Sequence, residues 1–439
     1  MRDIIVTSVV FGVLLLAFKH PHYGIYLWNW LSYMNPHKLA WGFATSIPFA
    51  FMTAIVTLTA YLFSKEPKRM PWTPETILLL IYLGWVTFTT FFAFYPDLAW
   101  LQWDKVLKIQ VMTLLTAMLI TDRKRLDGLV WVIALSFAFY GDKGGIFTIV
   151  HGGVYHVQGP ATTFVAGNNE MGLALIMTVP LLRYLHLQAR NKLIRLGLAA
   201  SMILTGLAAI GTQSRGALLA AVAMGSLLWL KSRNKATTAI YIIAAAGLVA
   251  AIMPPEYWAR MNTIETYQQD PSAMGRINAW HTAYNVARHH ITGGGFETFQ
   301  APTFQLYAPD PDNVHDVHSI YFEAMGEQGF IGLALFLLIG LTAWRTGSKI
   351  IRTCKKDPDR KWAADLAAMT QVSMIGYATG GAFLGLSYFD YPYSLVIILV
   401  LTYQIAVKNK WGVREVCKAA EPGAGQTMAG ERRKRQFQL

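Results

Sequence analysis

Residues 237–253, TTAIYIIAAAGLVAAIM, contain no charged side chain and form one continuous apolar block. Blocks of this kind recur along the chain at about 20 residues each, the length that a helix needs to cross a bilayer. Of the 439 residues, 54% are hydrophobic and only 14% are charged. Because soluble domains carry about 25% charged residues, the composition excludes a soluble enzyme. It predicts an all-α polytopic membrane protein.

Twelve membrane-spanning helices are predicted from the apolar blocks. Residues 22–35 are aromatic, short and followed by Pro36, so we expect residues 19–41 to form a re-entrant or interfacial segment rather than a span. The predicted spans lie at residues 4–18, 42–63, 75–94, 103–120, 126–150, 168–187, 194–212, 215–231, 237–253, 318–344, 362–384 and 388–407.

Basic residues predict the orientation of these spans. Clusters at residues 65–69, 123–125, 190–195, 231–235 and 345–361 fall on one side, which the positive-inside rule places in the cytoplasm together with both termini. The net charge of +13 therefore marks topology, and we expect no nucleic-acid partner. The two cysteines, Cys354 and Cys417, are also cytoplasmic in this arrangement, so no disulfide is expected.

One connection differs from the others in length. Residues 254–317 contain no long apolar run and fall on the outer side, and loops beyond about 12–15 residues are usually functional or disordered. We predict that this loop is folded, with helices near residues 256–268 and 272–290 and a turn at Gly293–Gly295. The predicted organisation is a membrane domain at residues 1–253, a periplasmic loop at 254–317, a membrane domain at 318–407 and a cytoplasmic tail at 408–439.

Several cations lie near the outer side, against the positive-inside bias. A cation within a span costs about 2.5–3.5 kcal/mol of insertion free energy. It is therefore expected only where an ion-pair partner or water offsets this cost, or where the cation has a function. Arg215 lies in a tight turn flanked by small residues, and Arg276 lies in the outer loop. The arginine fork suits phosphate oxygens, so both are predicted to bind an anion, with Arg288 and Lys105 as secondary candidates. Exposure on a loop helix is the alternative for Arg276, and snorkelling to the headgroups is the alternative for Lys105.

The end of the outer loop, residues 309–319 (PDPDNVHDVHS), is rich in aspartate and histidine. A metal site, an interfacial histidine without chemistry and a general base are the open interpretations. The segment has no ligand spacing of fixed geometry, so no metal is expected. At a helix N-terminus the macrodipole disfavours imidazolium, which favours a neutral His318 that accepts a proton. His318 is the predicted base and His315 the second candidate.

Two further motifs flank these residues. Asn168 opens a span on the outer side and either caps that helix or contacts a sugar hydroxyl. Gly326, Gly329 and Gly332 are expected on one face of the span after His318, where they serve helix packing or leave a groove for a lipid chain.

A lipid-diphosphate glycan donor fits this set of groups. Its tail would occupy the membrane, arginines would hold the diphosphate, and His318 would accept the proton of the acceptor hydroxyl. Direct attack inverts the anomeric centre, whereas double displacement needs a carboxylate nucleophile, for which Asp310, Asp312 and Asp316 are weak candidates. Asp316 is also a candidate contact for the sugar or the acceptor.

These residues resemble the bacterial O-antigen ligases. His318-Ser319, nine residues, Gly329, two residues and Gly332 match that family's histidine pattern after a long periplasmic loop. Ser214-Arg215-Gly216-Ala217 is similar to the arginine turn of the wider ligase and polymerase superfamily, and Gly275-Arg276 with Trp280 resembles its loop motif. The N-terminal stretch, with Trp28-Asn29-Trp30 and Asn35-Pro36-His37, resembles the exosortase-associated branch of O-glycosylation ligases.

The resemblance implies an inverting, metal-independent glycosyltransferase of the GT-C type, without a cofactor. It implies transfer of O-antigen from undecaprenyl diphosphate to the lipid A-core in the bacterial inner membrane, with the site facing the periplasm. It implies that His318 activates the acceptor, while Arg215 and Arg276 hold the diphosphate. An O-antigen polymerase and a protein O-oligosaccharyltransferase share the donor and the motifs, and a transporter of an anionic lipid-linked glycan is the alternative from another class.

Overall fold

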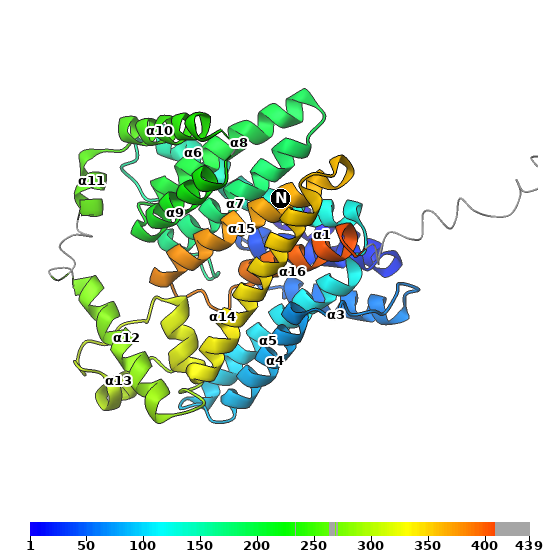
Figure 1. Ribbon diagram of the computed structural model, residues 1–439. Coiled ribbons are helices and arrows are strands. Elements are labelled where there is room, and N and C mark those ends of the chain that lie inside the picture. Colours follow the sequence, from blue (N-terminus) through cyan, green and yellow to red (C-terminus); the bar gives the residue numbers. More distant parts are fainter. Residues whose placement is uncertain (233, 263–267, 269–270, 409–439) are drawn as a thin grey trace, which may run out of the picture.

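The computed structural model describes residues 1–232, 234–262, 268 and 271–408, and every regular element in this part of the chain is helical (Figure 1). The α-helices are α1 (Arg2–Lys19), α2 (His22–Tyr33), α3 (Phe49–Phe63), α4 (Pro74–Thr90), α5 (Pro96–Leu119), α6 (Arg123–Val150), α7 (Asn168–Gln188), α8 (Lys192–Gly211), α9 (Arg215–Lys231), α10 (Lys235–Ile252), α11 (Pro255–Asn262), α12 (Pro271–His289), α13 (Ala301–Tyr307), α14 (Ile320–Cys354), α15 (Lys361–Gly380) and α16 (Asp390–Ala406).

Five of these helices, α6, α7, α8, α10 and α14, are long and apolar enough to cross a membrane, and α3, α4 and α16 are shorter apolar helices. The predicted all-α polytopic class is therefore confirmed, and a helix lies at each of the twelve predicted positions. The number of crossings and the orientation stay predictions.

One boundary differs from the expectation. The second predicted span was placed at residues 42–63, but α3 begins only at Phe49, after the short 3-10 turn η2 (Phe43–Thr45). Pro48 explains the late start, since a proline disfavours helical backbone in the residue before it. Residues 22–33 form the buried helix α2, about 18 Å long at 1.5 Å per residue.

Local sequence signals set the helix ends. The side chains of Asp122, Asn191 and Ser214 accept hydrogen bonds from the first backbone N–H groups of α6, α8 and α9, as N-cap residues do. Proline is the first residue of α4, α5, α11 and α12, where its fixed φ suits the first helical turn.

The core is built on helices that are apolar all round. α7 and α16 are buried along most of their length, as expected of helices that are hydrophobic on every face. By contrast, none of the residues of α10 is buried among the described parts of the chain. α14 runs obliquely through the molecule, and α12 and α13 lie beside its N-terminal half (Figure 1).

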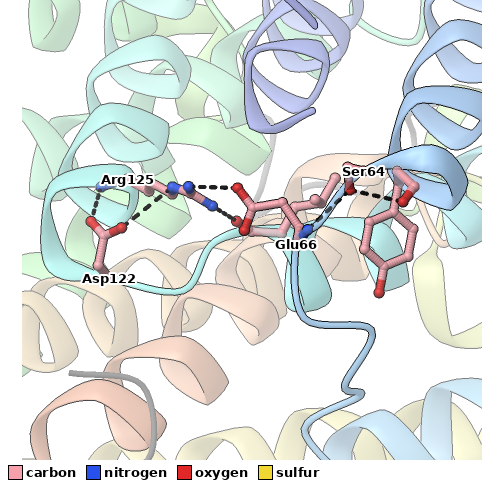
Figure 2. A network of polar contacts seen from close by, with 6 residues as sticks. Ser64, Glu66, Asp122 and Arg125 are labelled. Carbon is pink, nitrogen blue, oxygen red and sulfur yellow. Dashed lines mark hydrogen bonds and ion pairs between the residues drawn. The ribbon is translucent and has the colours of Figure 1, made fainter. Parts of the chain in front are cut away.

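An ion-pair network joins two of the predicted cytoplasmic loops (Figure 2). Arg125 Nη2 donates to Glu66 Oε1 at 2.7 Å, and Arg125 Nε lies 3.3 Å from Asp122 Oδ2. The Arg125 and Glu66 side chains are 20% and 19% exposed. The loop after α3 is thereby fixed to the start of α6, so the two basic clusters at residues 65–69 and 123–125 lie on the same side of the molecule.

Three parts of the expectations fall outside the described residues: the tail at 409–439 with Cys417, the loop-helix end at 263–267 and Arg233. The loop helix expected at residues 272–290 is confirmed as α12. Cys354 is a buried free cysteine.

Candidate active site

A cavity of about 410 Å³ lies at the N-terminal end of α14. Its walls come from α5, the segment before α7, the outer loop and the segment before α16. The lining residues are Gln102, Phe164, Glu297, Phe299, Gln300, Val314, His315, Asp316, Glu323, Glu327, Gly385 and Tyr388.

A break in α14 shapes the floor of this region. Gly329 has φ 68° and ψ −178°, so helical geometry stops there and resumes in the next residues. The carbonyls just before the break lose their partners within the helix, and they accept hydrogen bonds from elsewhere. Gly294 N donates to Gly326 O and Gly295 N to Glu327 O, both at 2.9 Å. In a lipid environment such carbonyls must be satisfied by the protein.

The glycine turn is thereby attached to α14. The expectation that Gly326, Gly329 and Gly332 share one face of a continuous helix is wrong, because the chain leaves helical geometry at Gly329. A β-carbon on Gly329 would lie 2.1 Å from the carbonyl oxygen of Ile291. The outer loop and the membrane helix therefore meet backbone to backbone.

Two glutamates that the sequence analysis did not select lie on the first part of α14, the buried Glu327 and the partly buried Glu323. Glu323 Oε2 accepts a hydrogen bond from Ser387 N at 2.9 Å, and Glu327 Oε1 accepts one from Glu297 N at 2.8 Å. Both line the cavity. Two acids spaced i, i+4 within a predicted apolar span were the available signal, since acids at such positions are usually functional.

His315 is the histidine that lines the cavity. Its ring lies against Gly275 of α12, where a β-carbon would be 2.6 Å from Cγ and from Nδ1. His315 Nδ1 is buried and has no hydrogen-bond partner among the described residues. The glycine of the Gly275-Arg276 pair thus leaves the room that this imidazole occupies.

His318 lies at the start of α14, as predicted, directly before the N-cap residue Ser319. It has a positive φ of 39°, and its Nδ1 lies 3.5 Å from Asp316 Oδ2. Trp280 Nε1 donates to Val317 O at 2.8 Å, which fixes the backbone between the two residues. Asp316 lines the cavity, whereas His318 is not among the lining residues. One nitrogen of the His318 imidazole therefore lies toward a carboxylate of the cavity wall.

Arg215 is the first residue of α9, and it is partly buried. The turn before it is closely held: Asn168 Nδ2 donates to Thr212 O at 2.8 Å, and Gln213 Nε2 donates to Gly153 O at 2.8 Å. Asn168 is the first helical residue of α7, and Gly167 is its N-cap, so the capping interpretation of Asn168 is wrong. Its side-chain amide fixes the position of the arginine turn instead.

Arg276 lies on α12, one turn before Trp280. The Trp280 ring stacks on Phe322 with centroids 5.0 Å apart and lies 6.3 Å from Phe383. Phe383 Cβ in turn lies 3.9 Å from where a β-carbon on Gly216 would be. Packed side chains therefore connect the Arg215 turn, the Arg276 helix and the segment that carries His318.

The two secondary cation candidates differ in position. Lys105 is exposed and donates to Gln102 Oε1 at 3.2 Å, and Gln102 lines the cavity. Arg288 is exposed in the last turn of α12, about 18 Å along the helix from Arg276 at 1.5 Å per residue. The fold therefore brings Lys105 near the cavity and leaves Arg288 away from Arg276.

The fold and the site define a polytopic helical membrane protein with two histidines and several carboxyl groups around the start of α14. Residues 200–337 match the model of the family described as O-Antigen ligase, which confirms that part of the resemblance and indicates a role in glycan transfer. Residues 1–191 match a family of unknown function (DUF5935). No curated protein matches the chain. One segment of this membrane protein, residues 200–337, is therefore similar to the O-antigen ligase family.

Proposed function

We propose that the protein is an inverting, metal-independent glycosyltransferase that moves O-antigen from undecaprenyl diphosphate to the lipid A-core. The observation that carries this proposal is the His318–Asp316 pair, 3.5 Å apart, whose aspartate lines a cavity, within the segment that matches the O-antigen ligase family. The site would face the periplasm, with the membrane domains at residues 1–253 and 318–407 in the bacterial inner membrane.

The transfer step follows from the roles of the side chains. Asp316 Oδ2 lies 3.5 Å from Nδ1 of His318. In the proposed step the carboxylate orients the imidazole, and Nε2 accepts the proton of the acceptor hydroxyl. The acceptor oxygen then forms a bond to the anomeric carbon as the bond from that carbon to the diphosphate oxygen breaks. The electron pair leaves with the diphosphate, and Arg215 and Arg276 stabilise its charge.

The partly buried positions of the two arginines support this division of labour. Arg215 begins α9 and Arg276 lies on α12, and packed aromatic side chains connect both to the His318 segment.

Reconstituted transfer tests the proposal directly. Purified protein in nanodiscs is given undecaprenyl-diphosphate-linked O-antigen and lipid A-core, and the product is followed on gels. We expect product with wild type and none with His318→Ala at equal expression and donor binding. Full activity of His318→Ala would end the assignment of the base.

Other acceptors in the same assay separate the related functions. Elongation of a second lipid-linked glycan would show a polymerase, and modification of a serine-containing peptide would show a protein O-oligosaccharyltransferase. A transporter would move the donor across the bilayer without changing a covalent bond.

A further inference from the structure

The cavity beside His318 is strongly acidic. Four of its lining residues are carboxylic acids, Asp316, Glu297, Glu323 and Glu327, and no lysine or arginine occurs among the lining residues that the structure describes. The arginines proposed for the diphosphate are not part of this lining. A phosphate group in this cavity would therefore meet carboxyl groups, and no lysine or arginine of the lining would pair with it.

Glu327 provides the second observation. Glu327 is 6% exposed, and it lines the cavity. Oε1 accepts the hydrogen bond from Glu297 N, whereas Oε2 is buried without a hydrogen bond in the described part of the chain; the Tyr388 side chain lies beside this carboxyl. A buried carboxyl oxygen without a donor is costly, and a ligand hydroxyl or ammonium group would supply that donor.

Space for such a ligand lies between two of the acids. A β-carbon on Gly385 would lie 3.5 Å from Glu323 Oε1 and 3.7 Å from Asp316 Oδ2. Both carboxyl groups therefore face a residue without a side chain. Carboxylates are pure acceptors when ionised, with room for several hydroxyl donors.

We propose that this acidic cavity is the subsite for the acceptor sugar and that it selects a sugar without a phosphate or carboxylate group on the part that enters. The assignment to the acceptor rests on the proposed function, because the lining residue Asp316 lies 3.5 Å from His318, the group that would accept the proton of the acceptor hydroxyl. Like charges that are forced together cost enough to exclude a ligand, so the same acids that hold hydroxyl groups reject anionic sugars.

A binding experiment tests this without turnover. The full chain in nanodiscs is titrated with the methyl glycosides of glucose, glucosamine and glucuronic acid, and binding is followed by ligand-observed NMR. In wild type, we expect the glucuronide to bind at least about tenfold more weakly than the glucoside, a difference of about 1.4 kcal/mol. The glucosaminide should bind at least as well as the glucoside.

Variants connect this selectivity to the cavity. Glu327→Gln should bring the glucuronide within about threefold of the glucoside. Glu297→Gln, at an exposed position on the rim, should narrow the difference as well, and it covers the case in which Glu327→Gln does not fold. Glu256→Gln, an exposed acid on α11 outside the lining, is the matched control and should keep the wild-type preference.

The outcomes separate this inference from the proposed function. Equal or tighter binding of the glucuronide to wild type would overturn the charge selection, whether or not transfer occurs. An unchanged preference in both Glu327→Gln and Glu297→Gln would place the selection elsewhere. Selective binding together with no transfer to any acceptor would keep the subsite and refute the transferase.

Discussion

The imidazole of His315 rests on the backbone of Gly275, so close that a β-carbon on the glycine would lie 2.6 Å from its Cγ and Nδ1. The contact joins the start of α12 to the loop before α14. Because Arg276 is the next residue, one short stretch of helix sets the positions of an arginine and of the cavity's histidine. Gly275 and Arg276 therefore act together: Gly275 leaves space for the His315 imidazole, and Arg276 supplies a positive charge for the proposed diphosphate site.

Gly275→Ala tests this arrangement. The added methyl group must displace His315 or move α12, and a misplacement of about 1 Å can cost 100-fold in rate. We expect kcat for transfer to fall by about 10- to 100-fold while the protein remains folded. Gly206→Ala is the control, because no atom lies within 4 Å of its β-carbon position in α8. Equal rates for the two variants would show that His315 has no role in transfer.

Asp316→Asn tests the orientation of His318. The amide keeps the shape of the side chain but loses the charge that faces His318 Nδ1 at 3.5 Å. We expect kcat to fall by about 10- to 100-fold, as for other groups that orient an active side chain, and Asp316→Glu to restore part of the loss. Asp312→Asn, on the same segment and outside the cavity lining, should retain the wild-type rate.

The kinetic constants distinguish the two roles that Asp316 can have. A change in the acceptor KM alone, with kcat unchanged, would show that Asp316 contacts the sugar and does not position His318. A change in kcat supports the positioning role.

Arg215→Ala is predicted to weaken use of the diphosphate donor. A lost hydrogen bond to a charged group costs about 1.5–3 kcal/mol, so the donor KM should rise by about 10- to 100-fold. Arg215→Lys should recover only part of this, since the ammonium group lacks the planar fork. Arg288→Ala, about 18 Å along α12 from Arg276, should leave the donor KM unchanged. A larger effect at Arg288 than at Arg215 would move the anion site to the outer end of α12.

Regular periodicity made much of this molecule predictable. Apolar blocks of membrane-spanning length lead to helices at the expected positions, and the N-terminal position of His318 follows from the abrupt change between the polar segment 309–319 and the apolar block that follows. Asp122 and Ser214 begin helices through side-chain caps, which are local signals that the sequence carries.

Long-range contacts account for what the sequence did not reveal. The sequence does not show a hydrogen-bond donor for Glu323 or for Glu327. The donor to Glu323 is Ser387 N and the donor to Glu327 is Glu297 N, and both residues are distant in the chain from the glutamate that they contact. The break at Gly329 also depends on a partner: helical spacing predicted a continuous face, but the glycine turn at residues 293–295 supplies the N–H groups that make the break stable.

The contact between the glycine turn and α14 leads to a prediction on stability. Gly329 has a backbone conformation, φ 68° and ψ −178°, that only glycine adopts readily and that costs other residues about 1–3 kcal/mol. Gly329→Ala adds to this a clash with the carbonyl of Ile291. We therefore expect a clear drop in the apparent Tm in detergent and faster proteolysis in the outer loop. Gly340→Ala in the same helix has open space around its β-carbon and should be neutral or stabilising by up to about 1 kcal/mol. Equal apparent Tm values for the two variants would contradict the break in α14. The carbonyls of Gly326 and Glu327 would then be bonded within a continuous helix in the detergent-solubilised protein.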